Sequence, residues 1–322
     1  MKWNKSILSL LSVLLLLILA ACGNKEEKTA GAEGEKEAPA EESYTIEHAM
    51  GTTEIKGTPE RVVILTNEGT EALLALGVKP VGAVQSYAGD PWYDHIKDQM
   101  EGVEVVGQED PVNVEAIAKL QPDLIIGNKL RQEKIYDQLS AIAPTVFSET
   151  LRGEWKENFE LYAKAVNKEE EGKEVIAAYD QRIADLKAEL GDKVKKEISM
   201  VRFMPGDVRI YHKDSFSGVI LEQLGFARPA EQDKDDFAEK NATKERIPAM
   251  DGDVLFYFTF EEGSGEATEL EKEWINDPLF KNLQAVKTGN AHKVDDSIWN
   301  TAGGVIAANK MLDDLSEIMK SK

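Results

Sequence analysis

Short apolar runs alternate with segments of helical periodicity from about Tyr44 to the end of the chain. The runs at residues 61–65 and 124–126 are almost continuous in Val, Ile and Leu, which is typical of strands buried on both faces. Stretches with helical spacing, such as residues 114–120 and 134–142, lie between such runs. The pattern predicts an α/β fold with a parallel-rich sheet, whose other strands are expected at residues 80–84, 103–106 and 145–147.

A long helix is expected at residues 168–190, near the middle of the chain. Its apolar positions follow one another three or four residues apart, which makes a single helical stripe. At 1.5 Å per residue the helix would be about 33 Å long, enough to join two lobes. We therefore expect two Rossmann-like lobes joined by one long rigid α-helix. The expected bounds are 44–166 for the N-terminal lobe, 167–192 for the inter-lobe helix and 193–322 for the C-terminal lobe.

One motif occurs on both sides of this helix. The pattern Glu-x-Ile-x-x-Leu/Met-x-x-Asp, followed by an apolar strand, begins at Glu115 and again at Glu245. Chance could produce one such match. Its placement, once in each expected lobe, favours pseudo-symmetric lobes.

The first residues resemble a bacterial lipoprotein signal. Lys2 and Lys5 precede a short apolar run that ends in Leu-Ala-Ala-Cys, with Cys22 as the only cysteine of the chain. The resemblance implies cleavage of a signal peptide (1–21) and lipidation of Cys22, although a stray thiol in a discarded segment is the alternative. Residues 22–43 have no large apolar side chain before Tyr44, which predicts a disordered acidic tether. The protein would then be lipid-anchored on the extracytoplasmic face of the cell membrane.

Charge narrows the classes of partner. With 38 basic and 59 acidic side chains, the net charge is -21. Nucleic acid is therefore an unsuitable partner, because neutralising phosphates needs a basic face.

Aromatic and cationic side chains recur just after the predicted strands. Ligands of open α/β sheets bind beyond the carboxyl ends of parallel strands, so these positions are candidates for ligand contacts. Each residue taken alone could equally be a packing residue or a solvated charge, and their convergence carries the prediction. The candidates are Tyr87, Trp92, Lys129, Arg131, Trp155 and Trp299.

A predicted hairpin gives the sharpest local signal. Residues 200–211 are expected to form two strands around a turn at 204–207, with Arg202 directly opposite Arg209. Like charges in that position are destabilising, and an anionic ligand between them would remove the cost. The alternative is that both reach solvent or pair with nearby acids. Tyr211 and His212 extend the same edge and are further candidates for ligand contacts. For His212 the alternative is a structural role.

The stretches EAIAKLQPDLIIG and KVDDSIW…GGVIAANKMLDDL are similar to those of periplasmic binding proteins with a helical backbone, which serve siderophore and cobalamin importers. The run NKLRQEKIYDQLSAIAPTV resembles the hydroxamate and citrate-hydroxamate siderophore branch. The resemblance implies a monomeric binding protein, not an enzyme, that captures a ferric siderophore for the membrane permease of an ABC importer. It also implies that Glu115 and Glu245 dock on the permease. Their alternative role is to place negative charge at helix N-termini. Since the siderophore fills the iron coordination sphere, no cofactor and no protein metal ligand is expected.

Three alternatives remain open. Direct metal binding has little support, because the four histidines form no close pair. An enzyme is disfavoured by the lack of the common nucleotide-binding and nucleophile motifs. A different cargo, namely haem, cobalamin or a catecholate siderophore, is the third; His212 and Tyr257 are the candidate haem ligands.

Overall fold

The computed structural model describes residues 42–320. A β-hairpin comes first, followed by a lobe built on a five-stranded parallel sheet in the order β5-β4-β3-β6-β7. This order is that of a Rossmann-like sheet, with its reversal point between β3 and β6. The strands are β1 (Ser43–His48), β2 (Gly51–Lys56), β3 (Val62–Ile64), β4 (Gly82–Ala83), β5 (Glu104–Val105), β6 (Leu124–Asn128) and β7 (Thr145–Ser148).

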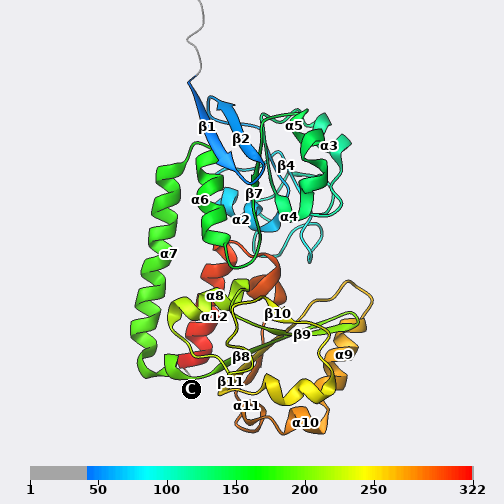
Figure 1. Ribbon diagram of the computed structural model, residues 1–322, viewed down its shortest axis with the longest axis vertical. Helices are drawn as coiled ribbons and strands as arrows, with labels where there is room; N and C mark the ends of the chain where they lie inside the picture. The colour runs from blue at the N-terminus through cyan, green and yellow to red at the C-terminus, as the bar shows by residue number, and fades with distance from the viewer. Residues whose placement is uncertain (1–41, 321–322) are drawn as a thin grey trace, which may run out of the picture. The chain divides into compact units, whose positions relative to one another are not determined.

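Helices cover this sheet and lead out of the lobe. In Figure 1 the lobe occupies the upper part of the molecule, and α7 (green) runs down one side to the second lobe. The helices are α2 (Asn67–Ala75), α3 (Val114–Lys119), α4 (Lys129–Gln132), η1 (Glu133–Ile135), α5 (Tyr136–Ser140), α6 (Trp155–Ala165) and α7 (Glu169–Leu190).

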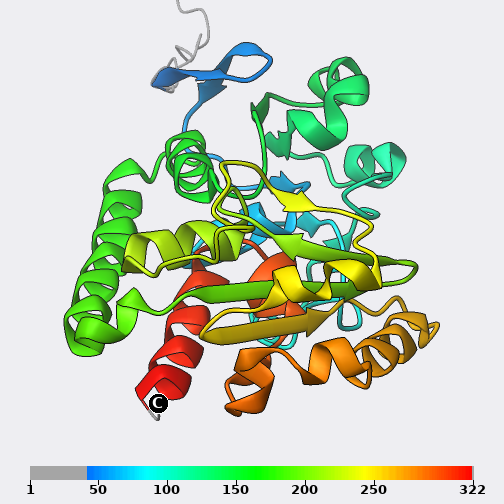
Figure 2. The ribbon, with the colours of Figure 1, turned by 60° about the horizontal axis from the view of Figure 1, so that its bottom comes forward.

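The second lobe has a mixed sheet in the order β10-β9-β8-β11-β12. Its strands β8, β11 and β12 are parallel, whereas β9 is antiparallel to both of its neighbours, so this sheet is only partly parallel. In Figure 2 the long strands run side by side, with α7 (green) and α12 (red) on the same side of them. The strands are β8 (Ile198–Met204), β9 (Asp207–Tyr211), β10 (Ala238–Glu239), β11 (Val254–Thr259) and β12 (Ala291–Lys293).

The remaining helices belong to the C-terminal part of the chain. A short π-helix, η4 (Ser297–Thr301), precedes the last helix, and the elements η2 (Gly191–Lys195) and η3 (Lys244–Met250) are 3-10 helices. The α-helices are α8 (Phe216–Leu224), α9 (Glu266–Ile275), α10 (Pro278–Lys281), α11 (Gln284–Lys287) and α12 (Val305–Lys320). None of the helices formed by residues 42–320 is both long and apolar enough to cross a bilayer.

The repeated motif occupies equivalent places in the two lobes. Asp123, at the start of β6, accepts hydrogen bonds from the backbone N–H groups just before β3. Asp253, at the start of β11, accepts one from Glu197 just before β8. Since β6 pairs with β3 and β11 pairs with β8, each aspartate fastens the beginnings of two parallel strands. The expected pseudo-symmetry of the lobes is present at this position.

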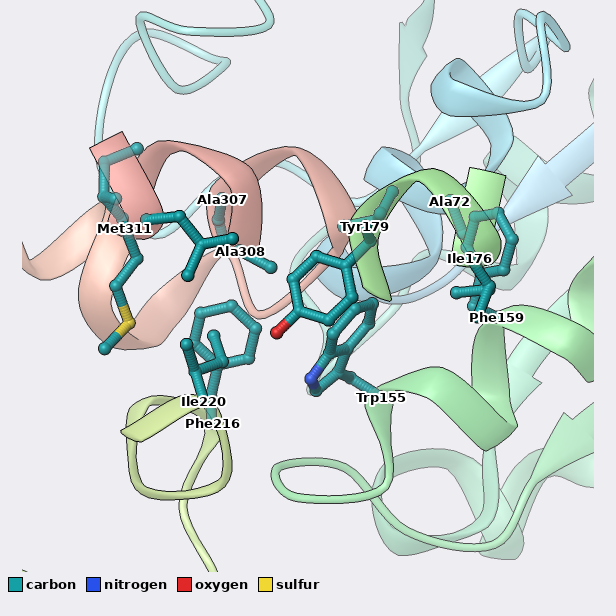
Figure 3. Close-up of a cluster of buried hydrophobic side chains, with 14 of the residues drawn as sticks. Ala72, Trp155, Phe159, Ile176, Tyr179, Phe216, Ile220, Ala307, Ala308 and Met311 are labelled. Atoms are coloured by element: carbon teal, nitrogen blue, oxygen red, sulfur yellow. The ribbon is translucent and has the colours of Figure 1, made fainter. Parts of the chain in front are cut away.

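A shared apolar core joins the lobes beside the long helix. Trp155 of α6 packs edge-on against Tyr179 of α7 and Phe216 of α8. Figure 3 shows these rings together with Ala307 and Met311 of α12. Polar contacts add to this packing, because Arg182 of α7 donates to side chains of α12 and the Glu71 carboxylate of α2 accepts from the Ala307 N–H. The lobes are therefore held together by several elements and not by α7 alone.

Candidate functional site

A cavity of about 450 Å³ lies between the two lobes. Residues of the N-terminal lobe form one wall and residues of the C-terminal lobe form the other. Its lining is rich in charged and aromatic side chains: Glu68, Tyr87, Glu109, Leu130, Arg131, Leu151, Arg152, Arg202, Met204, Arg209, Phe216, Phe237, Lys240 and Phe260, followed by residues 300–303.

Every strand of the parallel sheet contributes to the first wall beyond its carboxyl end. Glu68 follows β3, Tyr87 follows β4, Glu109 follows β5, Arg131 follows β6 and Arg152 follows β7. The cavity thus lies where ligands of open α/β sheets bind.

The opposite wall is built on the predicted hairpin. Its register is the expected one, with Arg202 opposite Arg209 and Phe203 opposite Val208. Phe203 and Val208 belong to an apolar cluster, while both arginines line the cavity. The period of two along each strand thus sends apolar side chains to one face of the sheet and guanidinium groups to the other.

Arg202 is the most buried cation of the cavity lining. It is 5% exposed, and its Nε and Nη2 donate to the two oxygens of Asp296 at 2.6 and 3.0 Å. Its Nη1 also lies 3.3 Å from the Tyr211 hydroxyl, to which it donates. Burial opposes the charge of Arg202, but Asp296 and Tyr211 outweigh this effect and hold its pKa above the usual range. The cavity therefore keeps a fixed positive group in this wall.

Two further arginines also have acidic partners. Arg209 Nε donates to Asp207 at 2.6 Å, and Arg131 Nε lies 3.3 Å from Glu109. The Tyr87 hydroxyl donates to the same Glu109 carboxylate at 2.9 Å, and burial together with that carboxylate raises the pKa of Tyr87. Arg202 and Arg209 thus pair with nearby acids, as the alternative prediction for the hairpin stated. Both nevertheless line the cavity.

Arg152 and Lys240 are placed differently. The Arg152 guanidinium lies over the Phe237 ring at 4.1 Å, and the Lys240 ammonium is 5.9 Å from the same ring. Within residues 42–320, neither has an acid at ion-pairing distance. Since the other three cations of the lining are balanced by carboxylates, these two give the cavity its uncompensated positive charge.

The family model of the periplasmic binding proteins matches residues 62–297. The chain belongs to this family. The resemblance of the sequence to periplasmic binding proteins is therefore confirmed, and so is the α/β fold with two lobes and a long helix between them.

Individual relatives refine the comparison. The chain is 56% identical to the Bacillus subtilis protein named probable siderophore-binding lipoprotein YfiY, over 97% of each chain. It is 31% identical to the Fe(3+)-citrate-binding protein YfmC of the same organism, over 99% of each chain. Among solved structures, Staphylococcus aureus SirA complexed with staphyloferrin B superposes with a TM-score of 0.80 at 38% identity, covering 86% of this chain and 98% of that one.

Only some of the candidate residues line the inter-lobe cavity. Tyr87, Arg131, Arg202 and Arg209 do so, and Tyr211 supports Arg202 from behind. Lys129 instead pairs with Glu149 outside the cavity. Lys129 and Arg131 are two residues apart on the short helix α4, so the two side chains do not share a direction.

The tryptophan candidates are core residues. Trp92 and Trp155 are buried in the large apolar cluster, and Trp155 lies between α6, α7 and α8. Trp299 packs on Phe256 and donates its indole N–H to Asp314. All three are absent from the cavity lining, because burying a large ring in an apolar core outweighs placing it at the strand exit.

His212 and Tyr257 also lie away from the cavity. His212 is buried, with its Nδ1 hydrogen-bonded to Asp236. Tyr257 packs on Phe203 and Phe280 on the apolar side of the C-terminal sheet. The two candidate haem ligands thus do not face the cavity, and no group of three or more His, Cys, Asp or Glu within residues 42–320 could hold a metal ion.

Several lining residues escaped prediction from the sequence. Phe237, Lys240 and residues 300–303 lie in irregular segments or short elements, where no periodicity marks them. Arg152 follows β7 as the strand-exit rule requires, and that rule could have found it. Glu68 also follows a strand, but it was not predicted because only aromatic and cationic residues were considered as ligand contacts.

The two motif glutamates are exposed. Glu115 lies in the first turn of α3, after the N-cap residue Asn113, and Glu245 lies in η3. The pKa of Glu245 is lowered, mainly by a hydrogen bond with the Thr243 side chain and further by one with the Glu245 backbone N–H. The Glu245 carboxylate therefore stays charged. Cys22 and the signal peptide lie outside the described residues.

Proposed function

We propose that this chain is an extracytoplasmic binding protein that captures a ferric siderophore bearing carboxylate groups and hands it to an ABC-type importer. The observation that carries the proposal is the set of cations around one inter-lobe cavity: Arg131, Arg152, Arg202, Arg209 and Lys240. Arginine forks donate several fixed hydrogen bonds to carboxylate oxygens, and aromatic rings supply apolar contacts to the rest of the ligand. The names of the relatives YfiY and SirA point to the same class of cargo.

The charge of the cavity favours a citrate-hydroxamate complex. Three of its cations already have a carboxylate partner, which leaves Arg152 and Lys240 for the ligand. Such a site suits an anion of low charge. A cavity of about 450 Å³ also falls within the range of sites for drug-sized ligands.

A catecholate siderophore is the second candidate. A ferric tris-catecholate complex is triply anionic, and with Arg152 and Lys240 the cavity lining holds five cations. If a catecholate ligand displaced Asp207 or Glu109 from their arginines, the cavity could balance a larger charge.

Docking on the permease is assigned to Glu115 and Glu245. Glu115 precedes β6 and Glu245 precedes β11, so each lobe carries an exposed carboxylate at an equivalent position. We further propose that acyl chains on Cys22 hold the protein at the outer surface of the cell membrane.

Calorimetric titration with a panel of ligands tests the cargo. The panel holds a ferric citrate-dihydroxamate of the schizokinen type, a ferrioxamine, a ferric tris-catecholate, haemin and cobalamin. We expect the citrate-dihydroxamate complex to bind most tightly. Preference for the tris-catecholate would move the proposal to the second candidate, and binding of haemin or cobalamin alone would refute both.

A further inference from the structure

Glu68 is an acid in the wall of a cavity whose other charged groups are mostly basic. It belongs to the first turn of α2, lines the cavity and is 5% exposed. On the side of the C-terminal lobe, residues 300–303 line the same cavity. A Cβ on Gly304 would lie 2.9 Å from the Glu68 carbonyl oxygen, and one on Gly303 would lie 3.9 Å from its Cβ. A Cβ on Gly304 would also lie 2.6 Å from the Glu71 Cβ, so glycine at position 304 lets the C-terminal lobe approach the start of α2 closely.

The hydrogen bonds of Glu68 leave one oxygen free for a ligand. Its Oε1 accepts from Asn158 Nδ2 at 2.8 Å and lies 3.5 Å from the Tyr162 hydroxyl. Among residues 42–320, its Oε2 has no hydrogen-bond partner and neither oxygen has a cation at ion-pairing distance. Glu109, the other acid of the lining, differs because Arg131, Tyr87 and Asn67 all contact its carboxylate.

The surroundings of Glu68 disfavour its charge. Burial is the largest effect and raises the pKa of Glu68 to about 8, with further upward contributions from Glu109 and Glu71. Hydrogen bonds from Asn158 and Tyr162 on α6 act in the opposite direction and are outweighed. Glu71 is itself hydrogen-bonded to His95. The cations that line the same cavity are Arg131, Arg152, Arg202, Arg209 and Lys240, and none of them forms an ion pair with Glu68. The segment of the C-terminal lobe that covers Glu68 adds only Asn300, Thr301 and backbone.

We propose that Glu68 contacts the ligand in its protonated form and donates a hydrogen bond from Oε2 to an oxygen of the bound anion. This inference rests on the proposed function, since it requires an anionic ligand in the cavity. A protonated carboxyl is a donor to an anionic oxygen, whereas a carboxylate at the same place repels it. Uptake of the anion is thereby coupled to the protonation of one buried group, and affinity falls at alkaline pH.

The test is calorimetric titration of the protein with the ferric citrate-dihydroxamate complex from pH 6.5 to 9.5. It is run in two buffers of different ionisation enthalpy, so that proton uptake is measured directly. For the wild-type protein we expect constant affinity up to about pH 7.5, and above pH 8 a loss of up to about tenfold per pH unit with uptake of up to one proton. Glu68→Gln, a neutral donor of the same shape, should bind within about threefold of wild type at pH 7 and lose both effects. Glu160→Gln, on the exposed face of α6, should behave as wild type.

Equal pH profiles in wild type and Glu68→Gln would overturn this inference and leave the proposed function standing. Absence of binding at every pH would overturn the proposed function and this inference with it. A ¹³C NMR titration of the ligand-free protein gives a separate reading. A Glu68 carboxyl that is already ionised at pH 6 would overturn the inference whatever the calorimetry shows.

Discussion

Arg202 and Asp296 form a buried pair in the cavity wall, with exposures of 5% and 8%. In Arg202→Ala the Asp296 carboxylate would stay buried without its partner. Removing one member of a buried ion pair costs about 3–5 kcal/mol, which we expect in urea unfolding. Arg209→Ala should cost less than about 1 kcal/mol, because Arg209 and Asp207 are more exposed.

The double variant Arg202→Ala/Asp296→Asn separates stability from binding. It should recover most of the lost stability, since no uncompensated charge remains, but not the affinity for the ferric siderophore. If Arg202→Ala alone unfolded like wild type, the Arg202–Asp296 pair would have no structural role in the cavity wall.

The raised pKa of Glu68 also predicts how stability depends on pH. Between the usual carboxyl pKa near 4.5 and the folded-state value of about 8, the folded state binds more protons at this residue than the unfolded state. Its contribution to stability is therefore complete below pH 4.5 and is lost as pH rises toward 8, by at most about 1.4 kcal/mol per pH unit. Glu68→Gln should exceed wild type in unfolding free energy at pH 8 by more than at pH 5. The same difference at both pH values would contradict the assignment.

At the scale of elements, α6 and α7 approach closely at Gly172. This glycine lies near the start of α7, and a Cβ there would meet the Ala163 Cβ at 2.6 Å. Alanine normally stabilises a helix by about 1 kcal/mol relative to glycine. We expect the opposite for Gly172→Ala, a loss of about 1–3 kcal/mol from overpacking. Glu174→Ala, on the exposed face of α7, is the control, and a stabilising Gly172→Ala would show that the helices separate at no cost.

Predictability from the sequence differed between elements. The hairpin register was predicted because strict alternation and a short turn leave one pairing that buries Val201, Phe203, Val208 and Ile210 together. The ends of the parallel strands were predicted from a different signal, the nearly continuous apolar runs of strands that are buried on both faces. The sequence did not predict which side chains after these strands face the cavity. Trp155 and Trp299, for example, pack on apolar partners from distant parts of the chain. Phe237 reaches the cavity through tertiary packing, which the local sequence pattern does not predict.

The whole molecule has two lobes tied by α7, by α12 and by the core around Trp155. Such a frame limits hinge motion, so we expect ligand binding to change the radius of gyration by less than about 1 Å in small-angle scattering. Closure by several ångströms on adding ligand would show that the ties between α2, α7 and α12 break during binding.

The proposed docking role predicts that transport depends on one glutamate from each lobe. Replacing Glu115 and Glu245 with Ala should abolish uptake of the ferric siderophore by cells and leave its affinity for the isolated protein unchanged. Weaker ligand binding by the double variant would remove the docking role, because both side chains are exposed and lie outside the cavity lining.

The uncompensated cations of the inter-lobe cavity, Arg152 and Lys240, are proposed to hold the anionic complex. The decisive experiment is calorimetric titration of wild type and of Arg152→Gln/Lys240→Gln with the ferric citrate-dihydroxamate complex. We expect tight one-to-one binding by wild type and at least about tenfold weaker binding by the variant, since each lost charge-assisted bond contributes about 1.5–3 kcal/mol. Equal affinity of the two proteins would place the ligand elsewhere and refute this role of the two cations.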